Sequence, residues 1–404
     1  MQLIVYNDDA TINYHCLDKE NLEDKKLKNH IGFIGSHSKE ENTLNIIQAY
    51  HSNSKAILFD YTNQPIVKKL HALGIPKFKE NFEQKTVFDE QDFSMMFFTS
   101  GSTGESVGAL KTKAHLEEEV KVLSEMFAKH NIKRVIVTVP FIHIYGTLFG
   151  LLYPLLNNID IILKEHFLPH DLLDLIDENS LIVTTPLYIK ALNKISQSKD
   201  LSQCVFVSST GPLDALSAKE FSQKFNTQVM QIFGSTETGG IAYKYNDDEL
   251  WTPMKKVEIS TNEQSELKIK SPFVSDVLYE NGFKNIHGEI QTFDYVEIKN
   301  KQFKLVGRSS QILKIAGKRY STIQIEHILE EIKDITKAMV FVDKEENSLR
   351  GETLNITLET SHTFTTKEIK KILQENLSNL KFSIKLHLVE KIPTSSVGKK
   401  LKIM

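Results

Sequence analysis

Residues 97–108, FFTSGSTGESVG, form a run of hydroxyl-bearing residues and glycines after two aromatic residues. Glycines let a backbone turn and approach a ligand without a clash from a Cβ atom. Free backbone N–H groups, together with the hydroxyls of Thr99, Ser100, Ser102 and Thr103, can surround phosphate oxygens. The apolar run MMFF directly before them predicts a strand that leads into the loop. A phosphate-binding loop and a Ser/Thr-rich turn both fit this stretch taken alone.

Three other segments each contain a charged residue that could act together with this loop. The Walker pattern GxxxxGK[ST] requires a lysine that residues 97–108 do not contain, so positive charge for a phosphate must come from elsewhere. Residues 231–240, QIFGSTETGG, set one carboxylate, Glu237, among small residues. TFDYVEI places Asp294 in a strand pattern, and EKIPTSSVGKKLKIM places Lys399 near the C-terminus. Taken singly, these residues also fit a solvated carboxylate, a turn aspartate and a lysine of a frayed terminus.

The four segments, in this order, resemble the adenylate-forming superfamily of acyl-CoA synthetases, aryl-acid ligases and carrier-protein adenylation domains. The resemblance runs from about residue 95 to the C-terminus. FIHIYGTLFGLLYPL, VSSTGPL and GSTETGGIA are most similar to compact AMP-dependent acid ligases that load CoA or an acyl carrier protein. The resemblance implies that a carboxylate attacks the α-phosphate of ATP, giving acyl-AMP and pyrophosphate, and that a pantetheine thiol then releases AMP. It implies ATP and Mg²⁺ as cofactors and CoA or phosphopantetheine as the acceptor.

The resemblance also assigns the nucleotide-binding roles. Thr236 would hold the α-phosphate, and Glu237 would bind Mg²⁺, a hard cation that prefers a carboxylate with phosphate and water oxygens. Asp294 would accept hydrogen bonds from both ribose hydroxyls, with Arg308 beside it. The adenine would lie among residues 209–211 and Phe233. The residues expected to bind ATP are Thr99, Ser100, Gly101, Ser102, Thr103, Gly104, Ser209, Thr210, Gly211, Phe233, Asp294 and Arg308.

The residues expected to take part in catalysis are Lys399, Thr236 and His143. Lys399 occupies the position of the family's catalytic lysine, whose ammonium would bridge the attacking carboxylate and the ATP oxygens. His143 and Tyr145 lie in PFIHIYG, where the family places a gate beside the acyl pocket; His143 alone equally fits a structural histidine. Gly317, in KIAGKR, would let the pantetheine pass closely because it has no Cβ atom.

The chain departs from the family pattern at several positions. After TSGSTGE the family continues Pro-Lys-Gly, whereas Ser106 and Val107 precede the glycine here, and Lys111 or Lys113 is a candidate to supply the missing charge. At the hinge, Ser310 replaces the common aspartate, and serine tolerates the backbone change that a hinge needs. The phosphate loop also begins early, which shortens the leading subdomain to residues 1–90.

Apolar periodicity predicts the elements that position these segments. Up to about residue 250, short Val/Ile-rich runs alternate with helical stretches, which predicts mostly parallel sheets packed with helices. Short alternating runs then predict a small antiparallel β subdomain, and a β/α pattern follows. We expect an α/β fold with an N-terminal ATP- and acid-binding body over residues 1–308 and a small mobile C-terminal α+β lid over residues 309–404.

Charge is distributed unevenly along a chain of ordinary globular composition. The 404 residues are 40% hydrophobic and 25% charged, with a net charge of −3. Residues 309–404 hold 16 Lys and Arg against 12 Asp and Glu, a net of +4, which leaves −7 on the rest. A basic lid favours an anionic partner, although a solvated lysine-rich surface also explains it. Nucleic acid is disfavoured because the lysines are scattered and not interleaved with aromatic residues.

The sequence favours a cytoplasmic protein. The start, MQLIVYNDDATINYH, lacks the basic flank and cleavage site of a signal peptide. We expect no membrane span, because no apolar run reaches about 18 residues. The two cysteines, Cys16 and Cys204, lie far apart without CxxC spacing, so neither a disulfide framework nor a zinc site is indicated.

The expected function is ATP-dependent activation of a carboxylic acid to acyl-AMP, followed by transfer to the thiol of CoA or of an acyl carrier protein. An alternative is a catalytically degenerate nucleotide-binding sensor or scaffold of the same fold, which Val107 and Ser310 favour. The intact residues Glu237, Asp294, Arg308 and Lys399 argue against that alternative.

Overall fold

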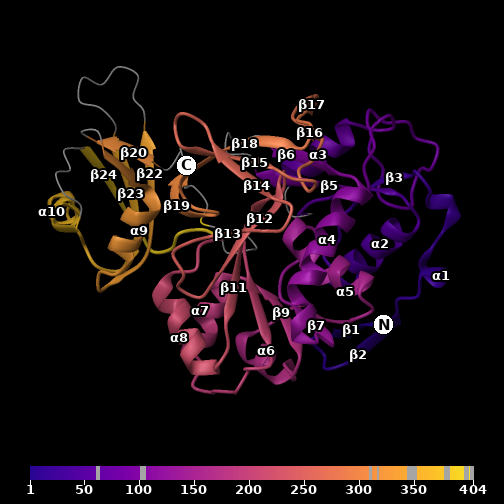
Figure 1. The fold of residues 1–404 in the computed structure, drawn as a ribbon, viewed down its shortest axis with the longest axis horizontal. Coiled ribbons are helices and arrows are strands. Elements are labelled where there is room, and N and C mark those ends of the chain that lie inside the picture. The colour runs from indigo at the N-terminus through magenta and orange to yellow at the C-terminus, as the bar shows by residue number, and fades with distance from the viewer. Residues whose placement is uncertain are drawn as a thin grey trace. The chain divides into compact units, whose positions relative to one another are not determined.

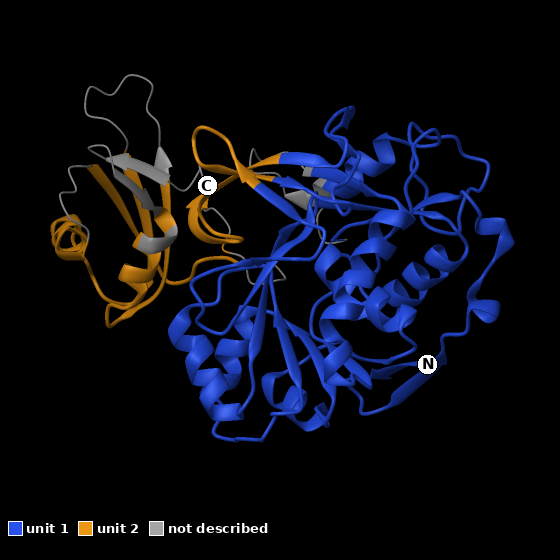
Figure 2. Cartoon of the chain, in the orientation of Figure 1, with its two compact units in different colours: residues 1–259, 269–290 blue, residues 260–268, 291–404 orange. Residues whose placement is uncertain are grey.

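The structure, a computed structural model of the chain, describes residues 1–60, 64–100, 106–308, 312–315, 318–343, 353–376, 383–394 and 400. It forms two compact units (Figures 1 and 2). Unit 1 comprises residues 1–259 and 269–290, and unit 2 comprises residues 260–268 and 291–404. In the described part of the chain, no helix combines the length and the apolar character needed to cross a membrane.

A nine-stranded mixed sheet forms the centre of unit 1. Its strands, in spatial order, are β13 (Thr252–Pro253), β12 (Gly239–Tyr245), β11 (Val229–Ser235), β10 (Val205–Ser208), β9 (Ser180–Thr184), β7 (Arg134–Val137), β8 (Asp160–Lys164), β1 (Gln2–Tyr6) and β2 (Ile12–Cys16). The six strands from β11 to β1 are parallel, and the strands outside them pair antiparallel. The predicted parallel strands are therefore confirmed.

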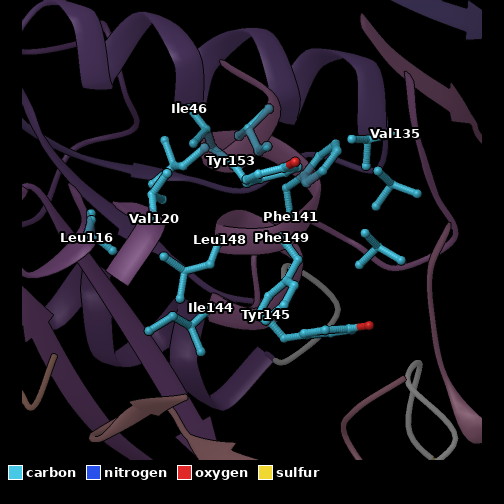
Figure 3. Packing of buried hydrophobic residues seen from close by; sticks show 14 of the residues in the cluster. Ile46, Leu116, Val120, Val135, Phe141, Ile144, Tyr145, Leu148, Phe149 and Tyr153 are labelled. Atoms are coloured by element: carbon cyan, nitrogen blue, oxygen red, sulfur yellow. The ribbon is translucent and has the colours of Figure 1, made fainter. Parts of the chain in front are cut away.

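Helices cover both faces of this sheet because its strands bury alternate side chains on opposite faces. On β7, Val135 and Val137 belong to one apolar cluster, and Ile136 belongs to a second. The helices whose side chains join the first cluster are α2 (Lys39–His51), α4 (Lys113–Phe127), a π-helix (Gly146–Leu152) and α5 (Tyr153–Leu156) (Figure 3). The second cluster includes side chains of α6 (Pro169–Leu175), α7 (Pro186–Lys194) and α8 (Ala215–Phe225).

A six-stranded sheet also belongs to unit 1. Its order is β17 (Phe283–Asn285), β16 (Val277–Tyr279), β6 (Ser106–Lys111), β5 (Met95–Ser100), β4 (Lys55–Leu58) and β3 (Ile31–Ile34). Strands β3, β4 and β5 are parallel, and β6, β16 and β17 follow antiparallel. The shorter helices of unit 1 are α1 (Lys19–Leu22), α3 (Gln64–Ala72) and two 3₁₀ turns, Lys25–Leu27 and Ala128–His130.

The first 90 residues are shared between the two sheets. Strand β1 pairs parallel with β8, so that Leu3 lies beside Ile161, whereas β3 and β4 belong to the six-stranded sheet. Leu3 and Val5 are both fully buried. The apolar runs HIGFIG and AILFDY, with the amphipathic stretch EENTLNIIQAYH between them, predict β3, β4 and α2, but no such pattern predicts β1, whose partner is more than 150 residues away in the chain.

Unit 2 combines small sheets with two helices. Strands β14 (Glu258–Thr261), β15 (Glu266–Lys270), β18 (Glu289–Lys299) and β19 (Gln302–Arg308) form a four-stranded sheet through which the unit boundaries pass. Strands β20 (Ile312–Ile315) and β21 (Lys318–Ser321) pair with each other. A three-stranded sheet of β22 (Ile335–Asp343), β23 (Thr353–Thr360) and β24 (Ser383–Val389) shares an apolar core with α9 (Thr322–Glu330) and α10 (Thr366–Asn376).

The fold class is α/β with a small C-terminal domain, as expected. The amphipathic stretches QIEHILEEIK and TKEIKKILQENL predict two helices in the C-terminal part of the chain, and these correspond to α9 and α10. The division into units follows packing and falls before residue 309. The predicted boundary between residues 308 and 309 is the hinge about which the C-terminal lid is expected to rotate, and it stays a prediction.

Candidate active site

The phosphate-loop segment connects two antiparallel strands. Thr99 lies opposite Val107, and Ser100 lies opposite Ser106, at the ends of β5 and β6. Residues 101–105 join them, so Gly101, Ser102, Thr103 and Gly104 lie outside the described residues. The predicted strand before the loop is confirmed, and its hydrogen-bonded ladder with β6 fixes where the loop begins and ends.

Thr236 and Glu237 lie on a tight turn between β11 and β12. The Thr238 hydroxyl closes the turn, because its oxygen accepts a hydrogen bond from the Ser235 N–H at 3.0 Å and it donates to the Gly239 carbonyl at 2.8 Å. Gly239 has a φ of +71°, and a Cβ atom there would lie 2.4 Å from Glu119 Oε2. Both conditions require glycine. The turn is therefore rigid, and it carries Thr236 and Glu237 as half-buried residues.

Two buried charged residues support this turn from the interior. The Lys111 ammonium donates to the carbonyl of Glu237 at 2.9 Å and to that of Phe273 at 2.5 Å. The Glu119 carboxylate accepts from the Gly240 N–H at 2.7 Å. Burial lowers the pKa of Lys111 to about 8 and raises the pKa of Glu119 to about 7, because each loses hydration as an ion.

Neither lysine proposed to replace the missing loop lysine is placed for that task. The Lys111 ammonium is held inside the protein by the two carbonyls. The Lys113 ammonium donates to Asn53 Oδ1 at 3.0 Å and lies 4.3 Å from the centroid of the Tyr50 ring. The hypothesis that either ammonium reaches the phosphates is therefore wrong for this structure.

The segment expected to frame adenine follows β10. The Ser209 hydroxyl donates to the Ile232 carbonyl at 3.0 Å, which joins the ends of β10 and β11. Thr210 has a φ of +77°, a rare conformation for a β-branched residue, and its buried hydroxyl has no hydrogen-bond partner. Strain and an unpaired hydroxyl at one residue are typical of functional segments. A Cβ atom at Gly211 would meet no other atom within 4 Å.

Phe233, the expected flat face for adenine, lies beside an aromatic residue that the sequence analysis did not select. Its ring centroid is 5.5 Å from that of Trp251, with the planes tilted by 50°. A β-bulge follows directly, between Phe233 and Gly234. Bulges re-aim side chains and often occur next to active sites.

His143 and Tyr145 lie just before the π-helix, an irregularity frequent at functional sites. Burial lowers the pKa of His143 and leaves its Nε2 without a hydrogen-bond partner, so the imidazole is neutral at pH 7. The Tyr145 hydroxyl lies 2.7 Å from the Val207 carbonyl and 3.0 Å from the Thr184 carbonyl. Figure 3 shows its ring against Phe149, at 5.2 Å between centroids, and its hydroxyl pointing away from that cluster. Tyr145 thereby joins β9 to β10.

In unit 2, the structure brings Asp294 and Arg308 together as expected. They are opposite each other on β18 and β19, and Arg308 Nε donates to Asp294 Oδ1 at 2.8 Å. Asp294 is only 5% exposed, and its backbone N–H donates to the Thr292 hydroxyl. The arginine therefore fixes a buried carboxylate in one orientation.

The predicted C-terminal residues Ser310, Gly317 and Lys399 lie outside the described residues. Their neighbour Lys400 is described. Its ammonium lies 2.8 Å from Glu326 Oε2 and 2.6 Å from Glu330 Oε1, and its backbone bridges to Thr394. Of the two lysines in PTSSVGKK, Lys400 is thus already held by two carboxylates.

The positions of Lys111 and Glu119 in the sequence indicate that both charges are buried, although neither residue was selected as a supporting residue from the sequence. Glu119 shares the apolar face of α4 with Leu116, Val120 and Leu123, and Lys111 ends an apolar strand. A charge among residues at helical spacing on an apolar face is expected to be buried and paired.

The family model described as AMP-binding enzyme matches residues 16–272, well over half of the chain. The chain belongs to the AMP-binding enzyme family. The matched range includes the phosphate-loop segment and the turn with Glu237, both of which are thus family segments.

Among curated proteins, the chain is similar to peroxisomal OPC-8:0-CoA ligase 1 from Arabidopsis thaliana, 24% identical over 349 residues. It is also similar to the putative long chain fatty acid-CoA ligase VraA from Staphylococcus haemolyticus, 23% identical over 320 residues. These alignments cover 78% and 75% of this chain. The chain spans 64% of the length of the first protein and 67% of the second.

Solved structures share the fold of this AMP-binding enzyme. One is o-succinylbenzoate CoA synthetase (MenE) from Bacillus subtilis in complex with ATP and magnesium ion, with a TM-score of 0.77 at 16% identity, covering 98% of this chain and 95% of that one. Another is ATP-bound MatB from Rhodopseudomonas palustris, with a TM-score of 0.75 at 14% identity and coverages of 98% and 93%.

Proposed function

We propose that this AMP-binding enzyme activates a carboxylic acid with ATP and transfers the acyl group to the thiol of CoA. A carboxylate oxygen of the acid would attack the α-phosphorus and displace pyrophosphate. The thiol sulfur would then attack the acyl carbon and displace AMP. The observation that carries the proposal is the rigid turn that holds Thr236 and Glu237, within the segment matched by the family model. The CoA ligases among the relatives support CoA as the acceptor.

The metal role of Glu237 is supported by the chemistry of its surroundings. Mg²⁺ is usually held by one or two carboxylates, with phosphates and water as its other ligands. Glu237 offers one half-buried carboxylate on a fixed turn. Across the described ranges, no three His, Cys, Asp or Glu side chains gather into a metal site, and a phosphate-held ion requires none. When bound, Mg²⁺ would neutralise charge on the phosphates.

The chain's own groups would hold the nucleotide. The segment from Thr99 to Gly104 would bind the β- and γ-phosphates, and the Thr236 hydroxyl would hold an α-phosphate oxygen. Asp294, oriented by Arg308, would accept from the ribose hydroxyls. The strained Thr210 supports an adenine role for residues 209–211 and Phe233.

The remaining roles concern the acid and the thiol. The neutral His143 would face the acyl group, with Tyr145 fixing the wall behind it. Lys399 would stabilise the charge that develops at the reacting phosphorus. Because Lys400 is bound by Glu326 and Glu330, it is not a competing candidate for that role. Gly317 would line the thiol's path, and Ser310 would serve as the hinge.

A phosphopantetheine carrier protein is the second candidate acceptor. Residues 309–404 carry a net charge of +4, which complements an acidic partner. If the carrier protein is preferred, its thioester should form faster than acyl-CoA, and the preference should weaken as salt rises. Equal rates that do not depend on salt would leave CoA as the acceptor.

The test is a panel of carboxylic acids in ATP–pyrophosphate exchange, followed by thioester detection with CoA or with holo carrier proteins. We expect exchange with at least one acid, dependent on Mg²⁺ and strongly reduced in Glu237→Gln. ATP binding without exchange for any acid would contradict the proposal and support a nucleotide-binding sensor or scaffold instead.

A further inference from the structure

Lys111 is a fully buried lysine that the reaction itself does not use. It ends strand β6, four residues after Val107, and is 1% exposed. Lysine is almost never fully buried unless its ammonium is paired, because dehydrating the charge is costly. Its ammonium donates hydrogen bonds to two backbone carbonyls, those of Glu237 and Phe273. A packing role alone would be served by an apolar side chain of similar length.

The carbonyl that Lys111 binds belongs to the residue proposed to hold the metal. The same Glu237 oxygen also accepts from the Ser275 N–H at 2.9 Å. Two donors on one carbonyl fix the peptide plane that follows Glu237, and they restrict the direction in which its side chain leaves the backbone. The Lys111 ammonium thereby joins the β5–β6 hairpin to the turn that carries Thr236 and Glu237.

Glu119 holds the same turn at its other end and supplies the opposite charge. It is 2% exposed, and its carboxylate binds the Gly240 N–H. The charges that act on Lys111 are those of Glu119, Glu237 and Asp276. His115, whose Nε2 lies 3.2 Å from Asp276 Oδ2, is the other titratable group near this cluster. The turn is therefore held between a buried cation and a buried carboxylate.

We infer that Lys111 is a positioning residue for metal-assisted ATP binding, which it serves by fixing the Glu237 backbone from the interior. The inference rests on the proposed function, because it takes Glu237 as the metal-binding carboxylate. Val107 stands where the loop pattern of the resembled superfamily has lysine, so that lysine charge is missing from the loop. The turn that carries Glu237 is therefore more important for binding the phosphates. The orientation of the phosphates then depends more on the ion that Glu237 holds.

The test compares ATP binding with Mg²⁺ and with excess EDTA by calorimetry on the full chain. The ratio of the two dissociation constants, the metal-dependent gain, isolates the contribution of the ion. In Lys111→Met this gain should fall about tenfold to a hundredfold, the range seen when a residue that orients a metal ligand is removed. Binding in EDTA should change little. Lys113→Met is the matched control, since that ammonium lies on Asn53 and Tyr50, and its gain should equal that of the wild type.

A double-mutant cycle separates positioning from general damage. If Lys111 acts through Glu237, adding Lys111→Met to Glu237→Gln should not lower the gain further. Where Lys111→Met alone does not fold, the variant Lys111→Met/Glu119→Gln leaves no unpaired buried charge and takes its place. An unchanged gain in folded Lys111→Met, or an additional loss on the Glu237→Gln background, would overturn the inference and leave the function standing. A wild-type protein that binds no ATP with Mg²⁺ would overturn both.

Discussion

At the scale of single residues, Gly211 is a glycine that the fold does not require. A Cβ atom there would meet no atom within 4 Å, and its φ is not in the left-handed region. This contrasts with Gly239, where the φ of +71° lies in the region that favours glycine and a Cβ atom would lie 2.4 Å from Glu119 Oε2. Residues 209–211 are proposed to frame adenine, and the open space beside Gly211 leaves room for that ligand.

We therefore predict that Gly211→Ala separates ATP binding from stability. The free energy of unfolding should stay the same or rise by up to about 1 kcal/mol, because alanine restricts the unfolded chain. ATP affinity should fall because the added methyl group would overlap with the space that the adenosine is proposed to occupy. Calorimetry with ATP and chemical denaturation would measure the two effects.

Gly282→Ala is the matched control, since a Cβ atom at Gly282 also meets nothing within 4 Å and no ligand role is assigned to it. It should leave ATP binding unchanged. Undiminished ATP binding in Gly211→Ala would remove residues 209–211 from the adenine site.

At the scale of elements, the phosphate-loop segment and the turn that carries Glu237 each belong to a hairpin. Each hairpin begins with the last strand of a set of parallel strands. Strand β5 is the last of three parallel strands before the antiparallel β6, and β11 is the last of six before the antiparallel β12. A hairpin keeps its connection short and held at both ends, whereas a parallel crossover needs a long connection. This topology explains why the turn that carries Thr236 and Glu237 can be tight.

Lys400, which forms an isolated β-bridge with Thr394, binds two carboxylates of helix α9, and this gives a prediction at this scale. Lys400→Met should lower the free energy of unfolding of unit 2 by about 1–3 kcal/mol, because Glu326 and Glu330 lose their shared cation. The partial exposure of all three side chains keeps the value below that of a fully buried pair. Far-UV circular dichroism during denaturation would measure it, whereas the fluorescence of the single tryptophan, Trp251, reports unit 1.

Lys371→Met provides the comparison, since Lys371 lies 3.9 Å from Glu375 on the exposed face of α10. An exposed pair of this spacing contributes less than about 0.5 kcal/mol. Equal effects of the two substitutions would mean that the contacts of Lys400 with Glu326 and Glu330 do not stabilise unit 2.

At the scale of the whole molecule, the two half-reactions should depend on different residues of the C-terminal region. Lys399→Ala should reduce pyrophosphate exchange by about 100-fold or more, because a positioned charge is lost. It should still convert supplied acyl-AMP to thioester. Gly317→Leu should do the reverse, because its side chain obstructs the thiol and not the nucleotide. Proportional loss of both activities in both variants would contradict this separation.

Stability should also depend on pH through buried histidines. Burial is the first cause that lowers the pKa of five of them: His30, His51, His115, His130 and His143. Below about pH 6.5 the unfolded chain binds these protons and the folded chain does not, so stability falls as pH falls. Glu119 and Glu326, whose pKa values burial raises, act in the opposite direction but are fewer.

We expect the free energy of unfolding to drop between pH 7.5 and pH 5.5, each histidine contributing at most about 1.4 kcal/mol per pH unit. Denaturant titrations at several pH values would show the slope. His130→Gln should make it shallower, because it removes one of these histidines. A stability that rises toward pH 5.5 would show that the histidines are not the dominant groups.

The sequence by itself determined the fold class, many of the strands and helices, and the segments that form the candidate site. Those features are local: apolar periodicity selects strands such as β7 and helices such as α2, and glycine and hydroxyl residues mark turns whose chemistry does not depend on distant partners. The Asp294–Arg308 pair was also predictable, because the two residues lie on adjacent strands of one hairpin.

Only the tertiary structure decided the features that depend on partners far apart in the chain. Strand β1 joins the nine-stranded sheet because β8 offers it an edge, and the Tyr145 hydroxyl joins β9 to β10. Lys111 was expected near the phosphates, but the carbonyls of Glu237 and Phe273 bind it inside the protein. A charged side chain takes the partners that folding brings within hydrogen-bonding distance, and these partners are more than 120 residues away. The local sequence places a lysine at residue 111, and the tertiary packing decides which groups its ammonium binds.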